Sequence, residues 1–272
     1  MSLINLNFES QYLRNNTEIS IILPDKPRDV DAKDYYESQK KYKVLWLLHG
    51  GYGNHSDWVR KSMIEIYARE KNLIVVMPSA LNSFYSDWPG FMMGFDMYGF
   101  LIGELMPLVY NWLPASSARE DNFIAGLSMG GFGAVKYAVN HPEKFAAAAV
   151  FSAAPINPKK VANSPASSFF QNLIDNAGGS EAFESSPDNT RKLILDKAKN
   201  GSLPKLYFAC GKDDFLYDDI YLPFKEYAQT NDIPITFEEM EGYAHEWRFW
   251  DLVIQRALVF FGLGDADLGK LF

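Results

Sequence analysis

The sequence has little of what would cross-link a chain, bind a metal or attract a polyanion. Its 272 residues include one cysteine, Cys210, which excludes an internal disulfide, and four histidines that lack the H-x-x-x-H or Cys/His spacing of a zinc site. We therefore expect neither a metal nor a cofactor. The formal net charge of −8 disfavours nucleic acid and anionic membrane surfaces as partners.

Long apolar runs are also missing. No stretch approaches the length of a membrane span, and the first residues show no basic segment followed by an apolar one. These absences predict a cytoplasmic protein with no signal peptide and no membrane partner, and they leave a homo-oligomer open. What is present is a large apolar share, 47% of the residues, and aromatic residues alone make up 15%. A chain of this length and composition can bury a substantial core and does not need disulfides or bound metals to stabilise it.

Strand and helix patterns alternate along the chain. Alternating apolar residues at 4–8 and 17–23 predict an antiparallel hairpin, and the polar residues 24–42 predict an exposed connection. Apolar strand patterns occupy 44–48, 73–77, 122–125, 146–151, 205–210 and 235–237. Helical patterns occupy 56–71, 96–112, 130–140, 216–231 and 247–262. We predict a single domain over residues 1–272, an α/β fold with a mostly parallel central sheet, the N-terminal antiparallel hairpin and helices on both faces.

One interval, residues 155–204, departs from this alternation. It is rich in Ser, Asn, Pro and Gly and lies between two predicted core strands, with short helical patterns at 166–177 and 190–200. Such a segment either caps a site at the edge of the sheet or is a surface insertion without a role in substrate choice. The residues alone leave both interpretations open.

The segment around Ser128 carries the chemistry. Residues 126–130 read Gly-Leu-Ser-Met-Gly, with a strand pattern before them and a small-residue helix pattern after them. G-x-S-x-G in that context is the nucleophile elbow of the α/β-hydrolase fold, in which the glycines relieve steric clashes around a strained serine. We predict that Ser128 is the nucleophile.

A serine nucleophile needs a base and an orienting carboxylate. The elbow fold orders them along the chain as serine, acid, histidine, and His245 is the histidine that satisfies this order. The acid should follow the strand at 205–210, where Asp213 and Asp214 are adjacent. A G-x-x-D turn from Gly211 favours Asp214 as the residue facing the histidine, with Asp213 as the alternative.

The developing oxyanion needs two backbone N–H donors. One should come from Met129, directly after the nucleophile. The other should come from the loop after the strand at 44–48, where we assign Gly51 first and Gly50 second because glycine lets the backbone turn its N–H inward.

These motifs together resemble the esterase D-like putative esterase family, and within it the tributyrin esterases of lactic bacteria and streptococci. The resemblance rests on residues 47–58, 126–134, 211–217 and 245–250, which occur in the family's order and cover nearly the whole chain. It implies an α/β-hydrolase fold and carries the family's serine, aspartate and histidine over to Ser128, Asp214 and His245.

The activity expected from this resemblance is that of a serine carboxylesterase. The chain would hydrolyse small-molecule esters of short-chain or small aromatic acyl groups through an acyl-enzyme. Alternatives within the family are S-formylglutathione hydrolase and feruloyl or acetylxylan esterase, and an acyltransferase with the same triad is an alternative of another class. Trp58, Trp88 and Trp247 flank the motifs and are predicted to bind substrate, whereas Trp250 is interpreted as core packing.

Overall fold

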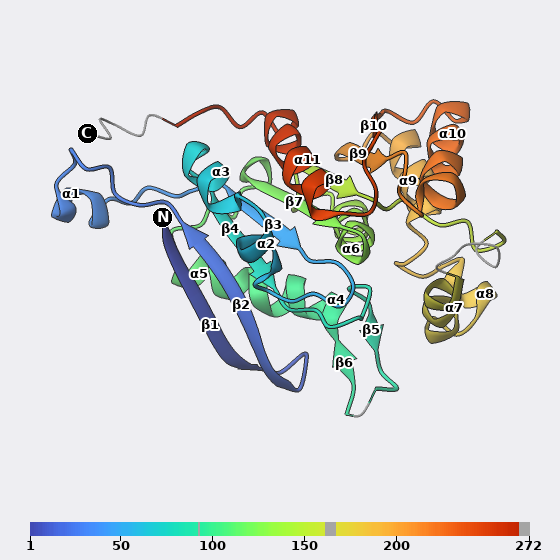
Figure 1. Cartoon of the computed structure of the whole chain (residues 1–272). Coiled ribbons are helices and arrows are strands. Elements are labelled where there is room, and N and C mark those ends of the chain that lie inside the picture. Colours follow the sequence, from blue (N-terminus) through green and yellow to red (C-terminus); the bar gives the residue numbers. More distant parts are fainter. Residues whose placement is uncertain (92, 161–166, 267–272) are drawn as a thin grey trace.

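The computed structural model describes residues 1–91, 93–160 and 167–266, and these residues form an eight-stranded sheet with helices on both faces (Figure 1). The strands, in chain order, are β1 (Ser2–Ser10), β2 (Asn15–Leu23), β3 (Val44–Leu48), β4 (Ile74–Pro78), β7 (Asn122–Leu127), β8 (Ala147–Phe151), β9 (Lys205–Gly211) and β10 (Ile235–Met240). Their order across the sheet is β1-β2-β4-β3-β7-β8-β9-β10. β2 pairs antiparallel with β1 and β4, and the other neighbours run parallel. The predicted mostly parallel sheet with an N-terminal antiparallel hairpin is therefore confirmed.

The continuous apolar runs are explained by burial on both faces of the sheet. In β3, Val44, Trp46 and Leu48 belong to one hydrophobic core, while Leu45 and Leu47 belong to a second core on the opposite face. Alternate side chains of a strand point to opposite faces, so a strand covered on both sides must be apolar at every position.

Helices cover each face of the sheet. The first core includes residues of α5 (Met106–Trp112), α6 (Met129–Asn140) and α10 (Leu222–Thr230). It also includes residues of three helices from the interval 155–204, which we call the insertion: α7 (Ser167–Asn176), α8 (Ser180–Phe183) and α9 (Thr190–Lys199). The second core includes residues of α2 (Asp57–Lys61), α3 (Ile64–Glu70) and α11 (Trp247–Phe260). Figure 1 shows α7 and α8 together beside the sheet, below α9 and α10 in this view. In the described ranges, no helix is long and apolar enough to cross a membrane.

Some predicted helices are interrupted. The pattern at 56–71 divides into α2 and α3 because Ser62 is extended, with φ −140° and ψ 176°. The pattern at 96–112 is α4 (Met97–Gly99), a π-helical turn η1 (Phe100–Leu105) and α5, and that at 216–231 is a π-helical turn η4 (Tyr217–Tyr221) and α10. Proline follows each π-turn, at Pro107 and Pro223. Since proline has no N–H, it cannot donate the bond that a regular α-turn needs there.

Shorter elements escaped the sequence pattern. The predicted exposed connection 24–42 contains α1 (Ala32–Tyr36), and a 3₁₀ turn η2 (Arg119–Asp121) precedes β7. A ribbon of β5 (Asp87–Trp88) and β6 (Phe95–Asp96) lies outside the main sheet. In the insertion, α7 and α9 match the helices predicted at 166–177 and 190–200. Residues 161–166, which include the first residue of the first predicted helix, lie outside the described residues.

The strand order places a crevice beside β3. From β3 the chain moves outward to β4, and it then returns to β7 on the other side of β3. The loop after β3 leads to α2 on one face of the sheet, and the turn after β7 leads to α6 on the other. Because the connections after β3 and β7 run to opposite faces of the sheet, they leave a crevice between them at the carboxyl ends of these strands. Open α/β sheets bind ligands in such a crevice.

Candidate active site

Ser128 occupies the strained turn between β7 and α6. Its backbone has φ 51° and ψ −121°, a conformation that L-residues rarely adopt, and its N–H donates to the carbonyl of Phe151 at 2.8 Å. The flanking glycines have no space for a side chain. A Cβ on Gly126 would lie 2.2 Å from the carbonyl oxygen of Gly130, and a Cβ on Gly130 would lie 2.5 Å from the carbonyl oxygen of Leu48. The close crossing of β7, α6 and β3 therefore explains the glycines of the elbow.

His245 is paired with Asp214. The imidazole Nδ1 lies 3.0 Å from Oδ1 and 2.9 Å from Oδ2 of the carboxylate, whose side chain is fully buried. A protonated Nδ1 that donates to the carboxylate leaves Nε2 of the neutral ring free to accept a proton. Asp213 is exposed instead, and its N–H donates to the carbonyl of Tyr243 at 3.1 Å. The G-x-x-D turn closes with a 3.2 Å bond from the Asp214 N–H to the carbonyl of Gly211.

The imidazole of His245 is held between aromatic rings. Phe215 lies 4.6 Å away between ring centroids, and Trp250 meets the imidazole edge-on at 5.0 Å and 88°. Trp250 is itself fixed by a 2.9 Å hydrogen bond from its Nε1 to the hydroxyl of the buried Ser152. Ser152 directly follows Phe151, so the end of β8 supports both the serine turn and the histidine ring. Trp250 is buried as expected, but it also lines the cavity described below.

The loop after β3 is fixed by His49. This buried side chain accepts the N–H of Ala80 on Nε2 at 2.9 Å, so its proton is on Nδ1, which donates to the carbonyl of Gly50 at 2.6 Å. Burial lowers the pKa of His49 from 6.5 to about 4. In a trans peptide, the carbonyl of Gly50 and the N–H of Gly51 point in opposite directions. By holding the carbonyl, His49 therefore also sets the direction of the Gly51 N–H.

The predicted donors of the oxyanion hole lie around Ser128. Gly50, Gly51 and Met129 line the same cavity as Ser128. A Cβ on Gly50 would lie 3.4 Å from the Cβ of Ser128 and 2.5 Å from Cδ1 of Leu127, so this stretch of backbone runs close beside the elbow. Met129 is the first residue of α6, where helical N–H groups have no partner within the helix.

Ser128 and His245 open onto a cavity of about 690 Å³. One group of lining side chains consists of phenylalanines in mutual ring contact, which we call the phenylalanine cluster: Phe84, Phe132, Phe169 and Phe170. A second group is charged and lies beside Trp247. Lys61 stands 5.2 Å from the Trp247 ring centroid and 3.1 Å from the Asp57 carboxylate, and Glu246 also lines this part.

Of the three tryptophans predicted to bind substrate, all in the described part of the chain, Trp247 lines the cavity and Trp58 and Trp88 do not. Trp250 also lines it. The Trp58 indole is buried in the second core, where it donates to the carbonyl of Leu48 and contacts the Trp247 ring at 5.2 Å. The Trp88 indole donates to the carbonyl of Ser83. Both side chains therefore support loops near the cavity.

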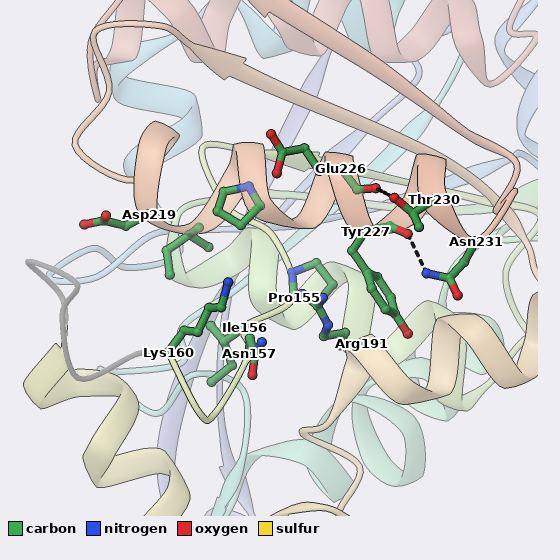
Figure 2. A pocket seen from close by; sticks show the side chains of 12 residues that line it. Pro155, Ile156, Asn157, Lys160, Arg191, Asp219, Glu226, Tyr227, Thr230 and Asn231 are labelled. Atoms are coloured by element: carbon green, nitrogen blue, oxygen red, sulfur yellow. Dashed lines mark hydrogen bonds between the residues drawn. The ribbon is translucent and has the colours of Figure 1, made fainter.

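A second pocket, of about 260 Å³, lies between the insertion and α10 (Figure 2). Its lining includes the cations Lys160 and Arg191 and the acids Asp219 and Glu226, and the Arg191 guanidinium stacks on the Tyr227 ring at 3.6 Å. Its described lining residues do not include Ser128, Asp214 or His245. Within the described ranges, no group of three or more His, Cys, Asp or Glu side chains could hold a metal ion. The elbow serine and the paired histidine therefore identify the larger cavity as the candidate site.

Comparison with known proteins agrees with this geometry. Residues 10–259 match the family described as putative esterase. The chain is 33% identical to the acetyl esterase of Caldicellulosiruptor saccharolyticus, with 94% of this chain and 97% of that one covered. It also resembles solved structures of two Staphylococcus aureus proteins, the fluorophosphonate-binding serine hydrolase FphF and the S-formylglutathione hydrolase FrmB. FphF shows 29% identity and a TM-score of 0.81, with 99% of both chains covered. FrmB shows 31% identity and a TM-score of 0.77, with 96% of this chain and 98% of the other covered. The chain belongs to the putative esterase family and is a carboxylic ester hydrolase.

Proposed function

We propose that Ser128, His245 and Asp214 are the catalytic triad of an esterase that acts on short-chain acyl esters through an acyl-enzyme. The observation that carries this proposal is the buried Asp214–His245 pair opening onto the same cavity as a serine in elbow geometry. A carboxylate on Nδ1 holds the imidazole in the tautomer whose Nε2 can accept the serine proton.

The reaction follows from these positions. Nε2 of His245 takes the proton of Ser128 Oγ as Oγ attacks the carbonyl carbon of the ester. The N–H groups of Gly51 and Met129, with Gly50 shaping the loop, stabilise the oxyanion. Collapse of the tetrahedral oxyanion intermediate breaks the bond between the acyl carbon and the alcohol oxygen, and His245 gives its proton to the departing alcohol. Water then attacks the acyl-enzyme with His245 again as base, which releases the acid and restores Ser128.

The cavity suggests where each half of the ester lies. Since His245 protonates the leaving oxygen, the alcohol lies on the side of its sequence neighbours Glu246 and Trp247, with Lys61 close by. The acyl group then faces the phenylalanine cluster, an apolar surface that suits a small hydrocarbon or aromatic acyl group. The similarity to an acetyl esterase supports a short acyl group, and the similarity to an S-formylglutathione hydrolase makes thioesters a second substrate class to test.

We further propose that the insertion, residues 155–204 of the single domain, is a cap over this cavity. Support comes from α7, because Phe169 and Phe170 on this helix line the cavity. We also propose a cytoplasmic location and small-molecule esters as the partners. Support for the location comes from the lone, buried Cys210, which suits a reducing compartment.

The test of the triad is acylation of Ser128. Nitrophenyl acetate should release a burst of one nitrophenolate per chain, and a fluorophosphonate should label the peptide that contains Ser128. Ser128→Ala should abolish the burst and lower kcat by at least about 10⁴-fold, since no other group can form the acyl-enzyme. Ser185→Ala, at an exposed serine of the insertion, is the matched control and should keep wild-type kcat. A Ser128→Ala variant that still shows a burst would place the nucleophile elsewhere. Added alcohols would reveal an acyltransferase if they captured most of the acyl groups.

A further inference from the structure

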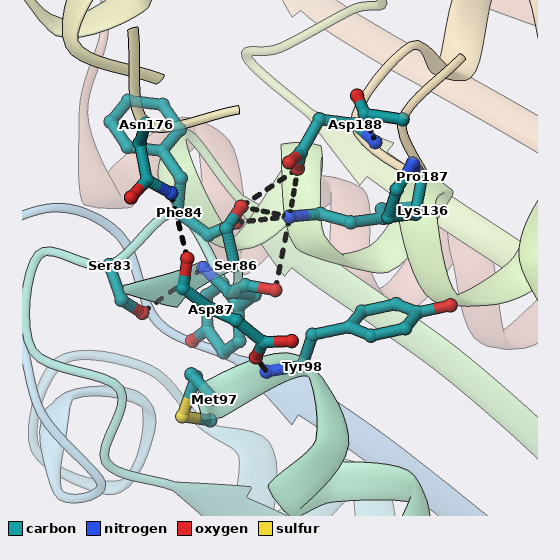
Figure 3. A network of polar contacts seen from close by, with 12 residues as sticks. Ser83, Phe84, Ser86, Asp87, Met97, Tyr98, Lys136, Asn176, Pro187 and Asp188 are labelled. Carbon is teal, nitrogen blue, oxygen red and sulfur yellow. Dashed lines mark hydrogen bonds and ion pairs between the residues drawn. The ribbon is translucent and has the colours of Figure 1, made fainter. Parts of the chain in front are cut away.

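A buried ion pair lies behind the phenylalanine cluster. The Lys136 ammonium, on α6, contacts the carboxylate of Asp188 in the insertion, and the two side chains are only 3% and 10% exposed (Figure 3). The ammonium also donates to the carbonyls of Phe84 and Tyr85, at 2.9 and 3.0 Å, and to the hydroxyl of Ser86. A desolvated pair of this kind contributes little net stability by itself, so its value lies in the geometry that it imposes.

The pair fixes the backbone of Phe84. Phe84 and Tyr85 both have φ 54°, in the left-handed region that is unfavourable for residues with side chains. Their carbonyls are held by the three-donor ammonium of Lys136, and Ser86 links the same loop to Asp188 with a 2.7 Å hydrogen bond. The direction in which the Phe84 ring enters the cavity therefore depends on Lys136.

Further contacts join the insertion to the same region. Asn176 at the end of α7 donates to the carbonyl of Asp87 at 2.7 Å (Figure 3). Asn140 at the end of α6 donates to the carbonyl of Pro187 at 3.0 Å. The phenylalanine cluster combines Phe84 from the loop, Phe132 from α6 and Phe169 and Phe170 from α7. The Lys136–Asp188 pair thus ties together the three segments that supply these rings.

Little space remains between the rings and the ion pair. A void of about 10 Å³ is lined both by the rings of Phe84, Phe132 and Phe170 and by Lys136 and Asp188. An acyl chain that reached past the rings would have to displace them and bring hydrocarbon against a buried charge pair. The second change is unfavourable because the ammonium and the carboxylate would lose hydrogen bonds to the protein without gaining hydrogen bonds to water.

We propose that the Lys136–Asp188 pair closes the acyl end of the cavity and sets the longest acyl group that the enzyme accepts. The proposal rests on the proposed function, in which the acyl group faces the phenylalanine cluster. Lys136 and Asp188 act through the rings and do not touch the reacting atoms. They are positioning residues that determine specificity.

The test compares acyl length in variants that remove the charges. Lys136→Met, Asp188→Asn and the double variant are assayed with nitrophenyl esters from acetate to octanoate. In the double variant, the ratio of kcat/KM for octanoate to kcat/KM for acetate should rise by about tenfold or more, mainly through a lower KM for octanoate. The kcat for acetate should stay within about threefold of wild type, because the triad is untouched. Asp188→Asn alone keeps the shape of the side chain and should show a smaller shift in the same direction.

A second ion pair provides the control. Lys225 on α10 and Glu239 on β10 are paired and partly buried, with side chains 22% and 19% exposed, and neither lines the cavity. Lys225→Met combined with Glu239→Gln should lower stability without changing the acyl-length ratio. The same shift in this control would assign the effect to general loosening and would overturn the proposal.

The remaining outcomes separate the two proposals. A normal nitrophenolate burst in the folded Lys136 and Asp188 variants, with the wild-type acyl-length profile, would overturn the role of the pair and leave the triad intact. An absent burst in the unmodified enzyme would instead overturn the proposed function, and the acyl pocket with it. If the double variant does not fold, the Asp188→Asn profile decides the question.

Discussion

At the scale of single residues, two adjacent carboxylates have opposite surroundings. Asp214 is buried against His245 and also accepts the N–H of Leu216 at 2.9 Å, whereas Asp213 is exposed. We predict that Asp214→Asn lowers kcat by about 10⁴-fold, because an amide in place of the carboxylate favours the wrong tautomer of His245. Asp213→Asn, the matched control, should cost less than about tenfold, since its side chain does not orient the imidazole.

Steady-state kinetics on both variants across pH would test this prediction. Raising the pH should not fully restore Asp214→Asn, because the wrong tautomer persists when the imidazole is neutral. A crippled Asp213→Asn beside an active Asp214→Asn would mean that the two aspartates have exchanged roles. Mild effects in both would place the acid elsewhere in the chain.

The residues that the sequence could and could not identify differ in one physical respect. Ser128, Asp214 and His245 are recognisable because local turns and chain order constrain them. The Trp250–Ser152 hydrogen bond and the Lys136–Asp188 pair join residues 98 and 52 positions apart, and no local pattern marks them. The same limit applies to Trp58 and Trp88, which lie near motifs in sequence while their side chains point into loops and core.

At the scale of elements, the elbow depends on backbones that approach too closely for a side chain. We predict that Gly130→Ala destabilises the fold by about 3 kcal/mol or more, since the added Cβ would lie 2.5 and 2.6 Å from the carbonyl oxygens of Leu48 and His49. These are backbone atoms of β3 and its loop, which cannot turn aside as a flexible side chain can. Urea unfolding followed by circular dichroism would measure the loss.

Gly90→Ala is the matched control for this prediction. A Cβ at Gly90 has no neighbour within 4 Å, so this variant should unfold at the wild-type urea concentration. A Gly130→Ala variant as stable as Gly90→Ala would show that β3 and α6 can separate at little cost. The crossing would then not be the reason for glycine at this position.

The sequence pattern predicted whether a segment is a strand or a helix more reliably than it predicted where that segment ends. Strands β3, β4 and β8 were predictable because both faces are covered and every residue is apolar. The break between α2 and α3 was not, since the apolar spacing continues through Ser62 and Met63 while the backbone becomes extended. The ribbon of β5 and β6 is two residues long on each side, too short for an alternating pattern to be recognisable.

At the scale of the whole molecule, His49 should make stability depend on pH. Its folded-state pKa is about 4 and its ordinary value is 6.5, so the unfolded chain binds the proton more readily over that interval. The stability from a neutral His49 is fully present above pH 6.5 and is lost as the pH falls towards 4. The pKa difference corresponds to about 3 kcal/mol. The physical cause is burial, reinforced by the Ala80 N–H, which cannot be accepted by an imidazolium.

Comparison of the wild type with His49→Gln isolates this contribution, because all other titrating groups are common to both. A glutamine can accept the Ala80 N–H and donate to the Gly50 carbonyl without titrating, so the variant keeps the loop contacts in outline. We predict that the free energy of unfolding, measured in urea at several pH values, falls by about 3 kcal/mol more in the wild type than in His49→Gln between pH 6.5 and about 4. Parallel curves for the two proteins would contradict a buried neutral His49. Since this histidine also directs the Gly51 N–H, the same acid titration in the wild type should disorder the loop after β3 as stability is lost.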